Sequence, residues 1–215
     1  MAVSKQEDPR ANQKERTRAA LVAAAAGMLR EGIAPGVAEA AQRAKVSRAT
    51  AYRYFPTQDS LLVEVTAVNP AIAPVEDMLD TLEGADANER MRRLLHSFIP
   101  IVQAEEMTMR TALRAYLDTW LESKRECAPT PAVREGRRMR WLDKALAPVR
   151  QQLPPAQWRR LRAALSLVLG IEAVVVLKDV CHASDEESLA TLEWAALALL
   201  QAGLAGAPAK PRAKR

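Results

Sequence analysis

Residues 47–54 carry the side chains of this sequence that are best suited to contacting a nucleic acid. Within about two helical turns they include two arginines, two tyrosines and two hydroxyl-bearing residues. Guanidinium, phenol and hydroxyl groups contact phosphates and the edges of bases. Ala51 and Phe55 are four positions apart, so both can face a core from one side of a helix. The pattern predicts a short helix with one basic, polar face and one buried face.

The residues on both sides of this helix predict that it is held against a second short helix. Residues 37–44 form a short apolar-periodic stretch, and a tight link at residues 45–46 follows it. Ser47 can cap the polar helix, because its hydroxyl can accept a hydrogen bond from a free N–H group of the first turn. Pro56 ends that helix, since proline disfavours helical geometry at the residue before it. Two short helices joined by a tight turn, the second basic and polar, predict a DNA-binding helix-turn-helix.

The same stretch resembles a known family. It reads Ala-Lys-Val-Ser at residues 44–47, Thr-Ala-Tyr-Arg-Tyr-Phe at 50–55 and Thr-Gln-Asp-Ser-Leu at 57–61. In this order it resembles the N-terminal DNA-binding domain of the TetR family of bacterial transcriptional regulators, over about residues 12–66. The resemblance implies a homodimer that binds a near-palindromic operator in double-stranded DNA. It also implies a C-terminal domain that binds an effector, and we expect a repressor that the effector releases.

The resemblance assigns DNA contacts to individual residues. Arg48, Ala49 and Thr50 would face base edges, Tyr52, Tyr54 and Gln58 would hold phosphates, and Arg53 could do either. The predicted DNA-binding residues are therefore Ser47, Arg48, Ala49, Thr50, Tyr52, Arg53, Tyr54 and Gln58.

Three residues depart from the family pattern. Lys45 stands where a turn glycine is usual, so a residue with a Cβ must adopt a left-handed conformation. Ala51 replaces a larger apolar residue, which predicts a different local core. Gln58 replaces a lysine, so one charged phosphate contact becomes a neutral one.

Composition and charge favour an all-α protein with one DNA-facing end. The chain has 215 residues, only 8 glycines and a hydrophobic content of 49%, and β-branched runs are rare. Residues 1–58 carry ten Lys/Arg and five Asp/Glu, whereas residues 59–208 carry 17 and 21. The positive charge is thus concentrated at the helix-turn-helix end, with a further +4 in the last seven residues.

Proline and glycine positions divide the chain into four predicted segments. We expect a flexible basic arm (1–11), a helix-turn-helix domain of three helices plus the start of a fourth (12–68), a helical regulatory and dimerisation domain (69–207) and a basic disordered tail (208–215). In the third segment Asp86 and Ser184 should begin helices as capping boxes. A helix should also run from residue 131 to about 153, and a long apolar one from 158 to 182.

Two sets of residues in the C-terminal domain are predicted to bind partners. Large apolar side chains on its middle helices suit a small hydrophobic effector, although each of them also suits a plain core: Phe98, Met107, Tyr116, Trp120 and Trp141. The resemblance implies that the last two long helices pair with a second copy, and the apolar stripes give these interface residues: Leu165, Leu169, Gly170, Ala173, Val176, Leu192 and Leu199.

Other classes of protein fit the sequence less well. The chain has two histidines and no phosphate-binding glycine loop, so we expect no catalytic residues and no cofactor. The cluster at residues 179–187 matches no standard metal site, and we expect no metal. Two separated cysteines and the lack of an apolar signal segment favour a cytoplasmic protein without a membrane span. A helical adaptor, or a nonspecific DNA-binding protein without an effector, stays open as an alternative.

Overall fold

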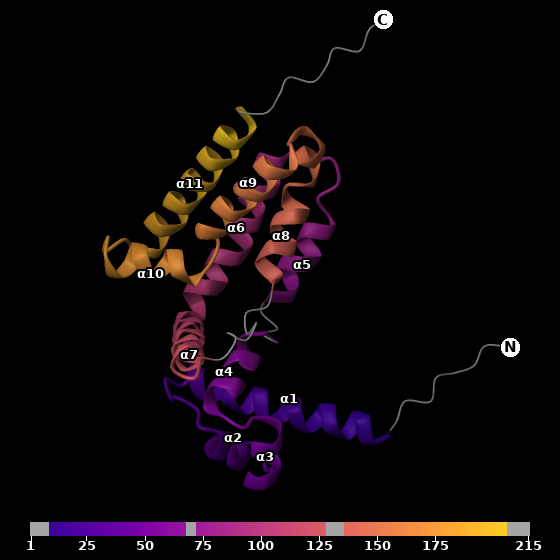
Figure 1. Cartoon of the computed structure of the whole chain (residues 1–215), viewed down its shortest axis with the longest axis vertical. Helices are drawn as coiled ribbons and strands as arrows, with labels where there is room; N and C mark the ends of the chain where they lie inside the picture. Colours follow the sequence, from indigo (N-terminus) through magenta and orange to yellow (C-terminus); the bar gives the residue numbers. More distant parts are fainter. Residues whose placement is uncertain (1–8, 68–71, 128–135, 206–215) are drawn as a thin grey trace, which may run out of the picture. The chain divides into compact units, whose positions relative to one another are not determined.

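The computed structural model describes residues 9–67, 72–127 and 136–205, and every regular element in these ranges is a helix (Figure 1). The all-α fold class is therefore confirmed. The predicted boundary between residues 68 and 69, the start of the helix expected at residue 131 and the C-terminal tail lie wholly or largely outside the described residues, as do residues 1–8 of the predicted arm. The helices are α1 (Pro9–Arg30), α2 (Val37–Arg43), α3 (Arg48–Tyr54), α4 (Gln58–Ala67), α5 (Ala73–Asp80), α6 (Ala87–Ala104), α7 (Glu106–Arg125), α8 (Arg137–Ala145), the 3-10 helix η2 (Ala147–Gln152), α9 (Pro155–Leu167), α10 (Ile171–Asp179) and α11 (Asp185–Ala205).

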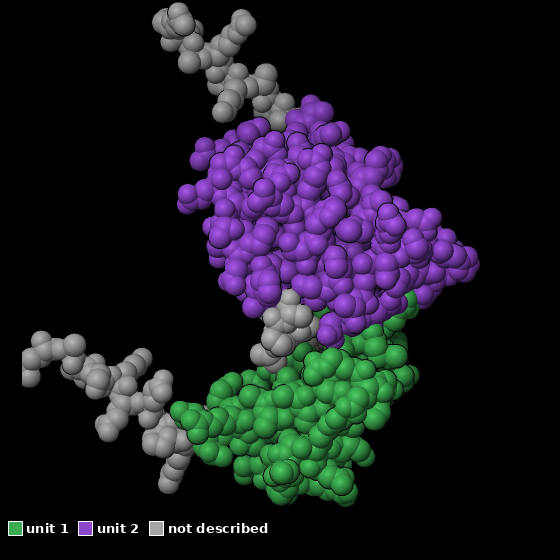
Figure 2. Space-filling model, turned by 180° about the vertical axis from the view of Figure 1, so that it is seen from behind, with its two compact units in different colours: residues 1–69, 107–134 green, residues 70–106, 135–215 purple. Residues whose placement is uncertain are grey.

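The chain forms two compact units (Figure 2). Unit 1 comprises residues 1–69 and 107–134, and unit 2 comprises residues 70–106 and 135–215. Helix α7 thus groups with the N-terminal helices, whereas the sequence analysis assigned its residues to the regulatory domain. The four segments predicted from sequence stay a prediction.

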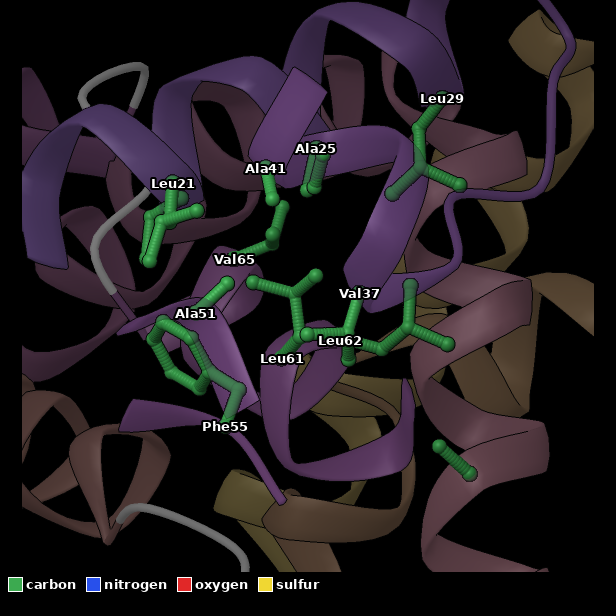
Figure 3. Close-up of a cluster of buried hydrophobic side chains, with 13 residues drawn as sticks. Leu21, Ala25, Leu29, Val37, Ala41, Ala51, Phe55, Leu61, Leu62 and Val65 are labelled. Carbon is green, nitrogen blue, oxygen red and sulfur yellow. The ribbon is translucent and has the colours of Figure 1, made fainter. Parts of the chain in front are cut away.

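Unit 1 is built on α1, which packs against α2 and α4, while α2 packs against α3. Leu21, Ala51, Phe55 and Leu61 converge on one small core, shown in Figure 3. Ala115 of α7 belongs to the same buried cluster. Its participation has no local signal in the sequence, because an alanine within a long helix suits many environments. The α3 face carrying Ala51 is thus fixed, half-buried Tyr54 packs against the same core, and Arg48, Ala49, Tyr52 and Arg53 are exposed.

Local caps begin and end the helices of unit 1 where the sequence predicts. The Ser47 hydroxyl accepts a hydrogen bond from the Thr50 N–H at 3.2 Å. At the start of α4, the Ser60 N–H donates to the Thr57 hydroxyl at 3.1 Å. Helix α3 ends at Tyr54, and Phe55 is extended in front of Pro56.

Unit 2 is centred on α6, which packs against α5, α8, α10 and α11. The carboxylate of Asp86 caps α6 by accepting from the Glu89 N–H at 2.8 Å, as predicted. The helix continues through Pro100. The side chains that α6 buries share one face: Ala87, Met91, Leu94, Leu95, Phe98, Ile99 and Val102.

Two long helices predicted for unit 2 are interrupted. The helix expected up to residue 153 ends at Ala145, and η2 follows it. Pro148 explains the change, because it has no N–H to donate to the carbonyl of Lys144. That carbonyl instead accepts from the Arg90 guanidinium at 3.2 Å.

The helix expected over residues 158–182 is also not continuous. It is divided into α9 and α10, with Gly170 between them at φ +154°. The Arg138 guanidinium crosses this break, donating to the Ser166 carbonyl at 3.0 Å and to the Glu172 carboxylate at 2.8 Å. Arg138 thus satisfies a carbonyl near the end of α9. The sequence prediction failed because the interruption depends on an arginine far away in the chain.

We expect Gly170→Ala to lower the free energy of unfolding by about 1–3 kcal/mol, the usual cost of such a backbone conformation in a residue with a side chain. A Cβ at this position would also lie 2.6 Å from Cζ of Arg138. Urea denaturation followed by circular dichroism measures the loss. Gly136→Ala is the matched control, because a Cβ there meets nothing within 4 Å and its φ is −72°. Equal stability of the two variants would contradict this account of the break.

Helix α11 begins at the second predicted capping box, which is confirmed. The Ser184 N–H donates to the Glu187 carboxylate at 2.8 Å, and the Glu187 N–H donates to the Ser184 hydroxyl at 3.2 Å. The hydrogen bond from the Ser184 backbone lowers the pKa of the Glu187 carboxyl. By length and composition α11 is apolar enough to cross a membrane, a property that core helices of soluble proteins share, and 22% of its most apolar window is buried.

Candidate nucleic-acid interface

Helix α3 divides into the two faces expected from the sequence. Ala51 is fully buried, and Phe55 directly after the helix is 3% exposed. The predicted DNA-binding residues lie elsewhere: Ser47, Arg48, Ala49, Tyr52, Arg53 and Gln58 are exposed, and Thr50 and Tyr54 are half-buried. The structure therefore brings the eight residues to the surface of unit 1 around one short helix. That they contact DNA stays a prediction.

Hydrogen bonds restrict one of these side chains. The Ser47 hydroxyl donates to the Thr50 hydroxyl at 2.8 Å while it also caps the helix. Thr50 is thereby held in a fixed orientation at the start of α3. Within the described residues, in contrast, the side chains of Arg48 and Ala49 make no hydrogen bond or ion pair that would compete with a binding partner.

Two arginines of unit 1 are committed to carboxylates of the same unit. Arg18 donates to Glu64 at 2.7 Å, which links α1 to α4. Arg43 forms a two-pronged pair with Glu31, one bond being 2.8 Å long. The hydrogen bond from Arg43 lowers the pKa of the Glu31 carboxyl, and the same bond raises the pKa of Arg43. Some basic side chains of unit 1 are thus paired with carboxylates and others are not, and the sequence alone cannot tell which.

A cleft of about 480 Å³ opens beside α3. It is lined by Gln13 and Lys14 of α1 and by Arg53 and Tyr54 of α3. The Arg53 guanidinium lies 5.9 Å from the centre of the Tyr54 ring, within the range of a cation–π contact. Lys14 is not among the residues predicted from the sequence to contact DNA, because nothing in the local pattern relates it to α3.

The turn before α3 contains the strained residue that the sequence predicts. Lys45 has φ +55°, and the Val46 N–H after it donates to the Ala41 carbonyl at 2.9 Å. We expect Lys45→Gly to raise the free energy of unfolding by about 1 kcal/mol, because glycine adopts this conformation without steric strain. Thermal denaturation measures the gain. Lys45→Ala removes the charge but keeps the strain, so an equal gain in that variant would attribute the effect to charge instead.

Helix α7 contributes to the electrostatics at the start of α4. Partial burial raises the pKa of Asp59, and the nearby carboxylate of Asp118 raises it further, while Arg114 opposes both effects. Asp118 and Arg114 belong to α7 and themselves lie 3.5 Å apart. The negative charge of Asp59 stabilises the N-terminus of α4, and the cost of burying that charge partly offsets this stabilisation.

The residues predicted to bind an effector do not form one group. Phe98 and Trp141 are packed edge to face in unit 2, with ring centres 4.8 Å apart. Met107, Tyr116 and Trp120 lie on α7, in unit 1. An open cleft of about 690 Å³ in unit 2 is lined by other residues: Asp143, Ala147, Pro148, Arg150, Gln151, Gln152, Trp158 and Arg162. The effector site therefore stays a prediction.

The residues predicted for a dimer interface are mostly internal to unit 2. Leu165, Leu169, Gly170 and Leu192 are buried, Ala173 and Leu199 are half-buried, and only Val176 is largely exposed. Three other apolar residues, which the sequence analysis did not single out for an interface, are far more exposed: Leu167 at 74%, Trp194 at 72% and Val180 at 71%. Periodicity could not separate them, because a helix that is apolar on all sides has no unique inner face.

The orientation of Trp194 follows from its neighbours on α11. Leu192, Ala196 and Leu200 face the interior of unit 2. The Glu193 carboxylate accepts hydrogen bonds from Arg92 at 3.2 Å and is 2.7 Å from Nε2 of His96, both on α6. The His96 hydrogen bond is the main reason that the pKa of Glu193 is lowered. These contacts fix α11 on α6 and turn the indole of Trp194 outward.

Comparison with known proteins gives a match in structure alone. No protein-family model and no curated protein matches the sequence. A solved structure of a TetR transcriptional regulator from Rhodococcus sp. RHA1 is 18% identical, with a TM-score of 0.57. The alignment covers 88% of this chain and 98% of that regulator. The chain therefore has the fold of a TetR transcriptional regulator.

Proposed function

We propose that this protein is a DNA-binding transcriptional regulator that reads its operator through α3. The observation that carries the proposal is the exposed polar face of α3 on a helix whose opposite face is fixed in a core. A polar helix of this kind can enter the major groove, where Arg48 can form two hydrogen bonds with a guanine. Tyr52, Arg53 and Gln58 are exposed beside it and can reach the backbone.

The regulator is proposed to act as a homodimer on a near-palindromic operator. Two recognition helices read such a site when they lie about 34–36 Å apart in successive major grooves. The exposed apolar residues Leu167, Val180 and Trp194 of unit 2 are the candidates for this interface, because burial against a second copy would remove a large apolar side chain from water at each position. A second copy suits α11 better than lipid does, since the helix already buries one face in unit 2 and carries the ion-paired Glu193. We accordingly propose a cytoplasmic protein.

Repression with release by an effector is the mode of action we propose. An effector that binds more tightly to a form with mis-spaced recognition helices must, by linkage, weaken DNA binding by the same factor. Phe98 and Trp141 are the two predicted effector-binding residues that lie together, packed edge to face in unit 2, and we propose that a small hydrophobic effector binds beside them. An effector of this kind would raise the melting temperature of the protein and displace it from the operator.

The deciding experiment is selection of bound sequences from a pool of random duplexes at near-physiological salt. An enriched inverted repeat would support a sequence-specific dimer, and its spacing would report the distance between the two recognition helices. Salt-sensitive binding without enrichment would favour a nonspecific DNA-binding protein. Absence of binding to any duplex would favour a helical adaptor, and the proposed function would be wrong.

A further inference from the structure

The cleft between α1 and α3, lined by Gln13, Lys14, Arg53 and Tyr54, has the composition of an anion site. These residues carry an ammonium, a guanidinium, an amide and a phenol, no carboxylate lines the cleft, and more of its lining is apolar than polar. All four groups can donate hydrogen bonds. Because the ammonium and the guanidinium are charged near neutral pH, they would attract an oxyanion to the cleft.

The charges of this cleft are available to a ligand. Arg18 and Arg43 of the same unit are bound by Glu64 and Glu31, respectively. Lys14 and Arg53, in contrast, join no ion pair within the described residues, and the only contact found for Arg53 is with the ring of Tyr54. Among the basic residues of unit 1, Lys14 and Arg53 are thus brought together without a carboxylate to neutralise them.

We propose that this cleft binds one backbone phosphate of the operator, with Lys14 and Arg53 donating to its oxygens. The proposal rests on the proposed function, because α3 supplies Arg53 and is also the helix assigned to base reading. A phosphate held between α1 and α3 would fix the orientation of the recognition helix on the duplex without reading sequence. Gln13 and Tyr54 would supply further hydrogen bonds to the same group.

The cleft could replace the charged phosphate contact that is lost where Gln58 stands in place of a lysine. The resemblance places a lysine at that position as a phosphate contact, and here the side chain is neutral. The cleft supplies a charged contact from a different helix, α1, so the protein keeps a charged phosphate contact beside the recognition helix. Lys14 is then a direct phosphate contact from outside the helix-turn-helix.

Lys14→Gln is the test, measured by fluorescence anisotropy of the full chain on its selected operator over a range of salt concentrations. Each phosphate contact contributes about 0.9 to the slope of log affinity against log salt. We expect the slope to fall by about 0.9 for each copy bound. Affinity should fall by the same factor on operator and on random duplex, since a phosphate contact carries no sequence information.

Two further variants separate this effect from a general loss of charge or fold. Arg18→Gln removes one positive charge from the same helix, but its guanidinium is already bound by Glu64, so the slope should stay as in the wild type. Lys14→Arg keeps the charge in the cleft and should restore the wild-type slope. A slope that falls equally in Lys14→Gln and Arg18→Gln would overturn the proposal.

Phosphate-ethylation interference identifies the contacted group directly. One position in each half-site should interfere with binding of the wild type and lose that effect with Lys14→Gln. An identical ethylation pattern for both proteins would overturn the cleft proposal while leaving the DNA-binding function intact. Failure of the wild type to bind any duplex would overturn both.

Discussion

Trp194→Arg is expected to convert the proposed dimer to a monomer while unit 2 stays folded. The indole is 72% exposed in the single chain, so its replacement removes little packing, and surface substitutions change stability by about 0.5 kcal/mol or less. In a two-fold interface both copies lose the ring. Buried tryptophans are typical interface hot spots worth at least about 2 kcal/mol each, which is roughly 30-fold in the dissociation constant. The two buried arginines would add their own dehydration cost.

Sedimentation velocity at micromolar concentration measures this change, and circular dichroism checks that the helices persist. Ile33→Arg is the matched control, because Ile33 is an exposed apolar residue of unit 1 and lies outside the proposed interface. That variant should sediment as a dimer. A Trp194→Arg protein that still sediments as a dimer would place the interface elsewhere on the molecule.

Arg48→Ala is expected to remove sequence preference at one base pair of each half-site. An arginine bound by two hydrogen bonds to guanine contributes about 1–3 kcal/mol of discrimination, or roughly 5- to 150-fold between the right and wrong base. Arg48 is exposed at the first turn of α3, where residues of a recognition helix reach base edges. Competition binding with operators altered at single positions measures the loss.

Arg43→Ala provides the comparison for that experiment. It removes the same charge from unit 1, but its guanidinium is bound by Glu31, so the ranking of operators should not change. The contribution of Arg48 differs from that of Lys14, which should alter affinity without altering the ranking. Unchanged discrimination in Arg48→Ala would count against its assignment to base reading.

Features set by neighbouring residues could be predicted from the sequence. The caps at Ser47, Asp86 and Ser184 were correct, because each depends on an oxygen and an N–H three residues apart. The left-handed Lys45 was expected for a similar reason, since it lies in a tight turn where the family has glycine. The exposed face of α3 followed from the spacing of Ala51 and Phe55.

Features that depend on distant contacts could not be predicted in this way. The break at Gly170 requires Arg138 from another helix, and the cleft beside α3 requires Lys14 from α1. Trp194 was not assigned to the interface because α11 is apolar on most sides, and its packing on α6 and α9 is what distinguishes the inner face. Those contacts join residues that no periodic pattern relates.

The place of Ala115 in the core of unit 1 has a consequence for synthesis on the ribosome. That alanine is 1% exposed among side chains contributed by residues 21–65. The helix-turn-helix therefore cannot complete its core until the chain has been translated beyond residue 115 and has left the exit tunnel. In a nascent chain released before that point, α3 would pack on an incomplete hydrophobic core. Folding of unit 1 is thereby delayed until part of the second half of the protein has been synthesised.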